Sequence, residues 1–285
     1  DGARSSPYYG VLQRQPTSNP FAIDNRLAGQ ADTTGAYQAW INAPLHERNK
    51  FLPKTPDKRL MGPETVTVSG VTYPEPGAYA RFLTSDSCCN AAGAGNYRLS
   101  ALQWRRHAHE NNNFGMTAGP AQSGNTGVAR IATVDENNLY AAEAYFHLGD
   151  LEAARELVNI TRTRPHRLPS GETYPGLPPA TINGATHSAP GLDNCVPRTD
   201  SGACGDLHVV IRYERMIELM GLNITRGFYD SRAFGLLPDD SWVQLPMPAP
   251  ELEQLGLDLY QFGGPDDPTA AVYAPVGGAN PNPKP

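Results

Sequence analysis

Residues 135–165, DENNLYAAEAYFHLGDLEAARELVNITRTRP, carry the strongest fold signal in the sequence. Apolar residues recur at helical spacing on both sides of Gly149-Asp150, which predicts two helices joined by a tight turn. Thr133 and Glu136 are spaced as a capping box at the start of the first helix, and Pro165 ends the second. Because one helix pair cannot bury its own apolar face, we expect neighbours to pack on both sides of it.

The spacing within this pair resembles a tetratricopeptide unit in its small, aromatic and turn positions, which are Ala142, Tyr145, Gly149 and Ala154. We therefore expect a mainly α fold with long irregular loops, built from tetratricopeptide-like α-α repeats. Further helices are predicted at residues 35–42, 207–220 and 225–234, and a minor β-hairpin at residues 63–83. Residues 97–110 fit a helix or a strand.

Composition and charge restrict the classes of function. The chain of 285 residues is 39% hydrophobic, so it can form a core, and its 28 glycines and 27 prolines predict many loops. A net charge of -6 without a basic run argues against nucleic acid as a partner. No apolar run has the length of a membrane span. The start at Asp1, without a leader, is what we expect of a processed chain.

Four cysteines indicate the compartment. Cys195 and Cys204 bracket a short loop and are predicted to form a disulfide. Cys88 and Cys89 are adjacent, and the sequence leaves their partners open. An even count in a loop-rich acidic chain favours an oxidising, extracellular location, with four free thiols in a reducing cytosol as the alternative.

Several short motifs follow one another along the chain: Asp57-Lys-Arg59, then Asn159 with Arg162 and Arg164, then Glu214-Arg215 with Glu218-Leu219, then Asp230, Arg232, Phe234 and Gly235, and finally Leu245-Pro-Met-Pro248 with Glu251-Leu252. In this order and spacing they resemble the C-terminal half of the SusD/RagB family of outer-membrane nutrient-binding proteins, over roughly residues 57–255. The resemblance implies a SusD-like helical fold at the extracellular or outer-membrane surface. It also implies capture of a glycan or peptide together with a TonB-dependent transporter, without enzyme activity.

The sequence divides into three expected segments: an irregular N-terminal arm at residues 1–56, a SusD-like helical domain at 57–262, and a Pro/Gly-rich tail at 263–285. Residues 1–30 and the tail contain few apolar residues, and these are spaced singly. Such segments bury little of themselves, so we expect both to lie mainly on other subunits of a homo-oligomer or polymer.

The candidate functional residues point to structure and binding rather than catalysis. A structural ion-pair network is predicted from charges at helical spacing, namely Glu214, Arg215, Glu218, Arg226, Asp230 and Arg232. Trp40, Trp104 and Trp242 are candidates for stacking on a ligand or for anchoring a core or interface. The sequence has no nucleotide-binding, hydrolase or zinc-protease motif. The metal-like cluster His107-Ala-His109-Glu110 is interpreted as a polar face, so no enzyme activity, cofactor or metal site is predicted.

Two functions remain open at this point. The first is a non-enzymatic extracellular protein that captures a glycan or peptide nutrient. The second is a structural subunit that self-assembles, through stacked helix pairs and exchanged termini, into an extracellular filament or tube. The sequence identifies neither the ligand nor the symmetry of an assembly.

Overall fold

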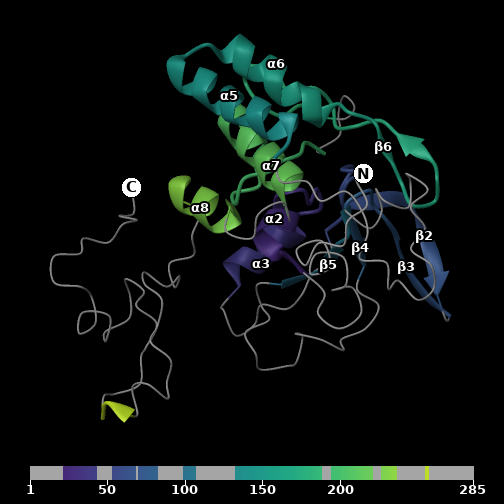
Figure 1. Cartoon of the computed structure of the whole chain (residues 1–285). Helices are drawn as coiled ribbons and strands as arrows, with labels where there is room; N and C mark the ends of the chain where they lie inside the picture. Colours follow the sequence, from purple (N-terminus) through teal and green to yellow (C-terminus); the bar gives the residue numbers. More distant parts are fainter. Residues whose placement is uncertain are drawn as a thin grey trace, which may run out of the picture. The chain divides into compact units, whose positions relative to one another are not determined.

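The computed structural model describes residues 22–43, 53–68, 70–82, 99–106, 132–187, 194–220, 226–235 and 254–256 (Figure 1). The chain divides into two compact units, Asp1–Leu222 and Asn223–Pro285, and each is described by itself. The expected tail at residues 263–285 lies outside the described residues, as does the arm before residue 22.

The first unit combines helices with short antiparallel strands. Its elements are β1 (Ala22–Asp24), α2 (Asn25–Gln30), α3 (Ala36–Asn42), β2 (Met61–Val68), β3 (Val71–Pro76), β4 (Ala80–Phe82), β5 (Leu99–Trp104), α5 (Val134–Leu148), α6 (Leu151–Arg162), β6 (His166–Arg167), β7 (Thr173–Tyr174) and α7 (Leu207–Leu219). The second unit contains α8 (Arg226–Ala233). The helices predicted at residues 35–42, 207–220 and 225–234 are confirmed as α3, α7 and α8.

Helices α5 and α6 are the predicted helix pair, and their ends are formed by the residues that the sequence indicated. The Thr133 hydroxyl accepts a hydrogen bond from the Glu136 amide at 3.1 Å, which caps α5. Gly149 has a φ of 82°, the left-handed conformation that ends a helix and favours glycine. Asp150 then caps α6 by accepting from the Ala153 amide, and α6 ends at Arg162, before Pro165.

Helix α7 covers the apolar face of the pair. Helix α5 contributes Leu139 and Ala142 to this contact, and α6 contributes Ala154 and Val158. These side chains are buried against one side of α7, which contributes Leu207, Val210 and Ile211. In Figure 1 the three helices lie together at one end of the first unit. This cluster is one of two apolar cores in the described part of the chain.

The second core lies where α2 and α7 meet the small sheets. Strands β1, β5 and β4 form an antiparallel sheet in that order, with Ala80 opposite Trp104. The ambiguous stretch at residues 97–110 therefore contains a strand, β5. Strands β2 and β3 form the predicted hairpin. The buried members of this core include Ile23, Leu27, Leu60, Tyr79, Leu102, Trp104, Tyr213 and Ile217.

The expectation of a mainly α, tetratricopeptide-like repeat is wrong. Only 40% of the described residues are helical, and three small antiparallel sheets accompany the helices in that part of the chain. Among the described residues, α7 is the helix that covers the pair, and strands take part in burying the apolar surface of the second core. Tyr145, which a repeat would place in the gap between helices, is 41% exposed.

Residues 22–43 belong to the core of their own chain. Ile23, Leu27 and Ala28 of β1 and α2 are buried in the second apolar cluster. In α3, Tyr37 and Trp40 are also buried, and the Tyr37 hydroxyl donates to Asp200 at 2.9 Å. This part of the expected irregular arm is therefore regular and packed within the first unit.

Candidate functional site

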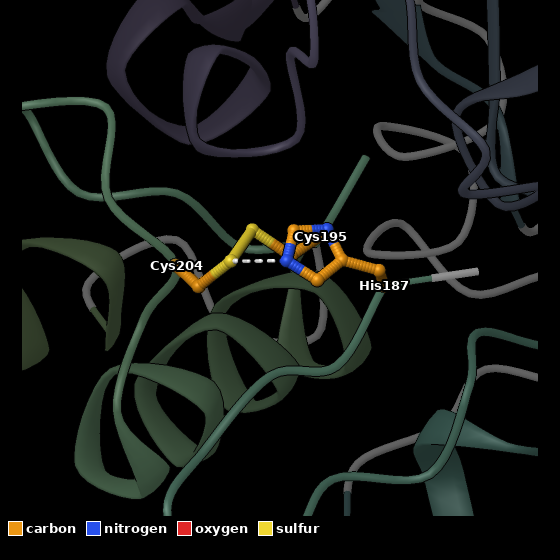
Figure 2. A group of neighbouring side chains, drawn as sticks. All are labelled: His187, Cys195 and Cys204. Atoms are coloured by element: carbon orange, nitrogen blue, oxygen red, sulfur yellow. Dashed lines mark hydrogen bonds between the residues drawn. A yellow bond between two sulfur atoms is a disulfide. The ribbon is translucent and has the colours of Figure 1, made fainter. Parts of the chain in front are cut away.

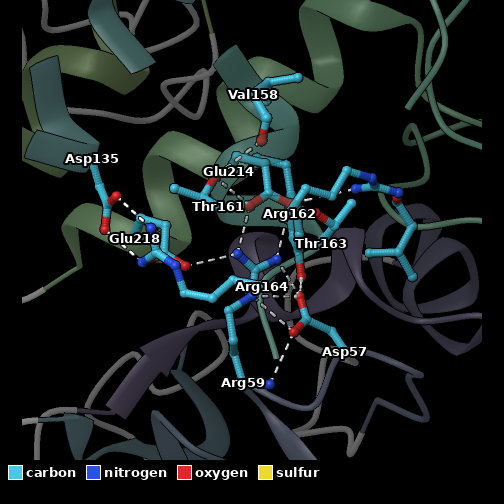
Figure 3. A network of polar contacts seen from close by, with 12 residues as sticks. Asp57, Arg59, Asp135, Val158, Thr161, Arg162, Thr163, Arg164, Glu214 and Glu218 are labelled. Atoms are coloured by element: carbon cyan, nitrogen blue, oxygen red, sulfur yellow. Dashed lines mark hydrogen bonds and ion pairs between the residues drawn. The ribbon is translucent and has the colours of Figure 1, made fainter. Parts of the chain in front are cut away.

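A network of buried charges joins the loop before β2 to helices α6 and α7 and to the end of β5 (Figure 3). Three carboxylates and three guanidinium groups form its centre, and their charges balance: Asp57, Glu214 and Glu218 against Arg59, Arg106 and Arg162. Each of these side chains is at most 2% exposed. A charged side chain is costly to remove from water, so each of these buried charges needs a close partner of opposite charge.

Arg59 lies at the centre of the network. Its Nε and Nη2 donate to Asp57 at 2.9 and 2.8 Å. Its Nη1 donates to Glu214 at 2.6 Å and to Glu218 at 3.0 Å, and Nη2 also reaches Glu214 at 2.9 Å. All five guanidinium N–H groups therefore have carboxylate acceptors, an arrangement that a lysine with three donors cannot reproduce.

Local backbone geometry places these groups. The Asp57 carboxylate accepts the Arg59 amide at 3.0 Å, which folds the loop so that both side chains enter the same space. Glu214 and Glu218 are four residues apart on α7 and so share one face of the helix. The remaining acceptor position on Asp57 is taken by the Tyr213 hydroxyl at 2.7 Å.

Two further arginines complete the network from other elements. Arg106, just after β5, pairs with the Glu218 carboxylate at 3.1 Å and donates to the Glu218 carbonyl at 2.6 Å. Arg162, the last residue of α6, pairs with Glu214 at 3.4 Å. Its other N–H groups donate to the carbonyls of Pro178 at 2.6 Å and Val196 at 2.5 Å. Arg162 thereby ties the long loop between α6 and α7 to the buried charges.

Electrostatics favour the charged forms of Asp57, Arg59 and Glu218. Burial alone raises the pKa of Asp57, but the charge and hydrogen bonds of Arg59, with the Tyr213 hydroxyl, lower it to about 2. Burial likewise opposes the charge on Arg59, yet Asp57 and Glu214 raise its pKa well above the ordinary value. For Glu218, Arg106 and Arg59 outweigh burial and lower the pKa.

His166 lies beside the network without joining it. Its ring meets the Tyr79 ring edge-on at 5.6 Å, and the Tyr79 hydroxyl donates to Glu218 at 3.0 Å. His166 is 5% exposed, and its Nε2 has no hydrogen-bond partner among the described residues. Burial, followed by the positive charge of Arg59, lowers the pKa of His166 to about 4. Its imidazole is therefore neutral at physiological pH.

The predicted ion-pair network is brought together only in part. Glu214 and Glu218 lie in the buried cluster. Arg215 points elsewhere and pairs with Glu143 of α5. Two of the predicted members belong to the second unit, where Asp230 is buried and Arg232 is exposed. The side chain of Arg226 lies outside the described residues.

The sequence interpretation missed the arginines that hold Glu214 and Glu218, which are Arg59, Arg106 and Arg162. It also missed Asp57, which pairs with Arg59. The motifs Asp57-Lys-Arg59 and Asn159/Arg162/Arg164 could be singled out in the sequence because they resemble motifs of the SusD/RagB family. Their convergence on one point is a tertiary property that no local pattern contains.

Cys195 and Cys204 form a disulfide in the loop between α6 and α7 (Figure 2). Their Cα atoms lie 5.7 Å apart, an ordinary separation for this bond. His187 lies beside it, with Nε2 3.6 Å from the Cys204 sulfur, while its Nδ1 accepts the Asn194 amide at 3.3 Å. Cys88 and Cys89 lie outside the described residues.

The two tryptophans that the structure describes do not fit the ligand-stacking interpretation. Trp40 is 6% exposed and Trp104 is 5% exposed, so neither ring face is available to a sugar. They are core anchors, which was the other interpretation of these residues. Trp242 lies outside the described residues, as does the His107–Glu110 cluster.

Two groups of side chains in the described part of the chain have metal-ligand character. One is His187 with Cys195 and Cys204, and the other is Glu143 with His147 and His208. Within each group the ligand atoms lie within 4.8 Å of one another. In the first group the two sulfurs are bonded to each other in the disulfide. The second group consists of one carboxylate and two imidazoles.

Comparison with protein families, with characterised proteins and with solved structures finds no match to this chain. Within the described ranges, no helix is long and apolar enough to cross a membrane.

Proposed function

We propose that this chain is a non-enzymatic binding protein related to the SusD/RagB family, which captures a glycan or peptide at the extracellular or outer-membrane surface. The observation that carries the proposal is the convergence of the family-like motifs. Asp57-Lys-Arg59, Arg162 and Glu214 with Glu218 are spread over much of the first unit and yet meet in one buried network. Residues that resemble family motifs and share one structural role support the proposed relationship.

The buried network is suited to holding a scaffold and unsuited to chemistry on a ligand. Its carboxylates are at most 1% exposed and each is paired with an arginine. A general acid or base must come within hydrogen-bond reach of the substrate. These carboxylates are already engaged with cations inside the protein, so the proposal assigns them a supporting role.

The long connection between α6 and α7 is the proposed ligand-binding surface. Arg162 fixes it at Pro178 and Val196. Asn159 fixes it at Ala180 through a reciprocal pair of hydrogen bonds, at 3.0 and 2.8 Å. The disulfide adds another constraint. Loops of this length are usually functional, and a loop held in place loses less entropy when it binds a ligand. On this proposal a TonB-dependent transporter receives the captured nutrient.

Isothermal titration of the tag-free protein against soluble oligosaccharides and short peptides tests this function. We expect saturable binding of one class, with the ligand recovered chemically intact. Cys195→Ser with Cys204→Ser should weaken binding by loosening the loop. The control is Arg155→Met, which removes a solvent-accessible ion pair on α6 and should bind as the wild type does. Conversion of the ligand, or equal affinity in the disulfide variant, would contradict the proposal.

A structural subunit is the second candidate function, because the helix pair presents apolar residues to solvent. Val134 and Leu148 of α5 are 75% and 80% exposed, and Ile160 of α6 is 45% exposed. Helix faces of this kind can stack on another copy of the chain. Sedimentation velocity and electron microscopy over a concentration series test assembly. If the chain polymerises, Leu148→Glu should abolish assembly, and Leu255→Glu, at a leucine that is 59% exposed in the second unit, serves as the control.

A further inference from the structure

Glu143, His147 and His208 bring three metal-ligating groups to one place. Glu143 and His147 are four residues apart on α5, so both project from the same face of that helix. His208 is the second residue of α7, which packs against α5. Their ligand atoms lie within 4.8 Å of one another, and His147 is exposed while the other two are half-buried.

Neighbouring side chains hold these groups in position. The Phe146 ring stacks on the His208 ring, with centroids 4.8 Å apart and planes only 8° from parallel. Phe146 also meets the His147 ring edge-on at 5.6 Å, so one aromatic ring supports both imidazoles. Arg215 pairs with Glu143 and lies 4.1 Å from the Tyr140 ring. Such supporting contacts fix ligand orientation in metal sites.

We propose that Glu143, His147 and His208 bind a single divalent transition-metal ion, with zinc as the expected metal. Two imidazoles and one carboxylate are a known ligand set for zinc sites that keep an open coordination position. Imidazole nitrogen favours zinc, copper or nickel over calcium and magnesium, which prefer oxygen. Because His147 faces solvent, water completes the coordination.

The ion pair with Arg215 is compatible with a metal on Glu143. A carboxylate has two oxygens with about four acceptor positions between them. Arg215 occupies Oε2, so Glu143 can orient against Arg215 and still offer an oxygen to the metal. The proposed ion would bridge α5 and α7, and binding to the folded state alone raises the midpoint of thermal unfolding. The proposed site differs from the sequence-based prediction, which assigned no metal site.

Titration of the full-length, tag-free protein, stripped of metal with a chelator, tests this site. Zinc binding is measured by calorimetry and cobalt by its visible absorption, with the thermal midpoint recorded alongside. The variants are His147→Ala, at an exposed position where the fold is not at risk, and His208→Ala. The control is His187→Ala, which removes a histidine outside the cluster.

The expected result is one zinc per chain, a cobalt absorption band, and a thermal midpoint that rises with zinc. His147→Ala and His208→Ala should each lose saturable binding, the band and the thermal shift, while His187→Ala keeps all three. Absence of saturable binding in the wild type overturns the proposal. So does wild-type affinity in either cluster variant, or an equal loss in His187→Ala, because each places the metal elsewhere.

Discussion

Replacing Arg59 with methionine is the sharpest test of the buried network. The substitution keeps an unbranched apolar stem but removes the guanidinium cation from three buried carboxylates. Glu218 retains Arg106 and Glu214 retains Arg162, whereas among the described side chains Asp57 retains only the Tyr213 hydroxyl. We therefore expect most of the lost stability to come from Asp57.

The magnitude follows from the shift in the pKa of Asp57. Lowering that pKa from 3.8 to about 2 contributes about 2 kcal/mol to the free energy of unfolding at neutral pH. The weakened hydrogen bonding of Glu214 and Glu218 adds to this. We therefore expect Arg59→Met to cost about 3–5 kcal/mol, the range for removing one member of a buried ion pair.

Urea unfolding followed by tryptophan fluorescence measures this cost, because Trp40 and Trp104 are buried in the folded protein. The matched control is Arg155→Met on α6, where the ion pair with Glu152 is partly exposed and the expected cost is about 0–1 kcal/mol. If Arg59→Met does not fold, Arg59→Lys, which keeps the charge and loses the five-donor fork, gives the measurement. A cost no larger than that of the control would refute the argument.

The pH dependence provides an independent check on the same variant. Because the pKa of Asp57 is lower in the folded protein, its contribution is complete above pH 3.8 and is lost as the pH falls towards 2. Arg59→Met should lose this dependence, and its penalty relative to the wild type should shrink in acid. A penalty that stays constant from neutral pH to pH 2 would show that packing rather than charge is responsible.

Three further predictions follow from the described residues. Burial lowers the pKa of His166 to about 4, so the unfolded chain binds a proton at a higher pH than the folded chain does. The contribution of His166 to stability is therefore complete above pH 6.5 and falls by roughly 3 kcal/mol towards pH 4. Urea midpoints should show this fall in the wild type and not in His166→Gln. Alkylation without reductant should leave Cys195 and Cys204 unmodified, as judged by mass spectrometry, and modification of both would contradict the disulfide. Leu139→Ala, at a fully buried position of α5, should cost about 2–5 kcal/mol in urea unfolding, whereas Leu148→Ala, 80% exposed on the same helix, should change stability by less than about 0.5 kcal/mol.

Local sequence signals were sufficient for most of the helices, although α2 (Asn25–Gln30) was not predicted. The Thr133 cap and the Gly149 turn act within one helical turn of their own positions, so their effect is readable from neighbouring residues. The sheets depended on contacts between distant segments. Trp104 lies in a strand because it pairs with Ala80, and no pattern around residue 104 shows which segment will be its neighbour.

In the candidate site, too, local spacing identified some residues, and only the tertiary structure brought the others close. Glu214 and Glu218 could be grouped from their spacing, but Arg215 was grouped with them wrongly. One residue along a helix turns the side chain by about 100°, which aims Arg215 at Glu143 of α5 rather than at the network. The true partner, Arg59, is 155 positions from Glu214 in the chain. A charge at that distance is found only when the fold brings it close.

Helix α7 is where the separate features of the first unit meet. It contributes Val210 and Ile211 to the core with the helix pair, and Tyr213 and Ile217 to the core with the sheets. The same helix carries Glu214 and Glu218 on the buried network and His208 in the proposed metal group. Displacing α7 would therefore expose both cores and leave the Arg59 guanidinium without two of its carboxylate partners at once. For this reason a chain with modest helical content can hold the long connection between α6 and α7 in place: the connection is anchored by Arg162 to the same charges that fix α7.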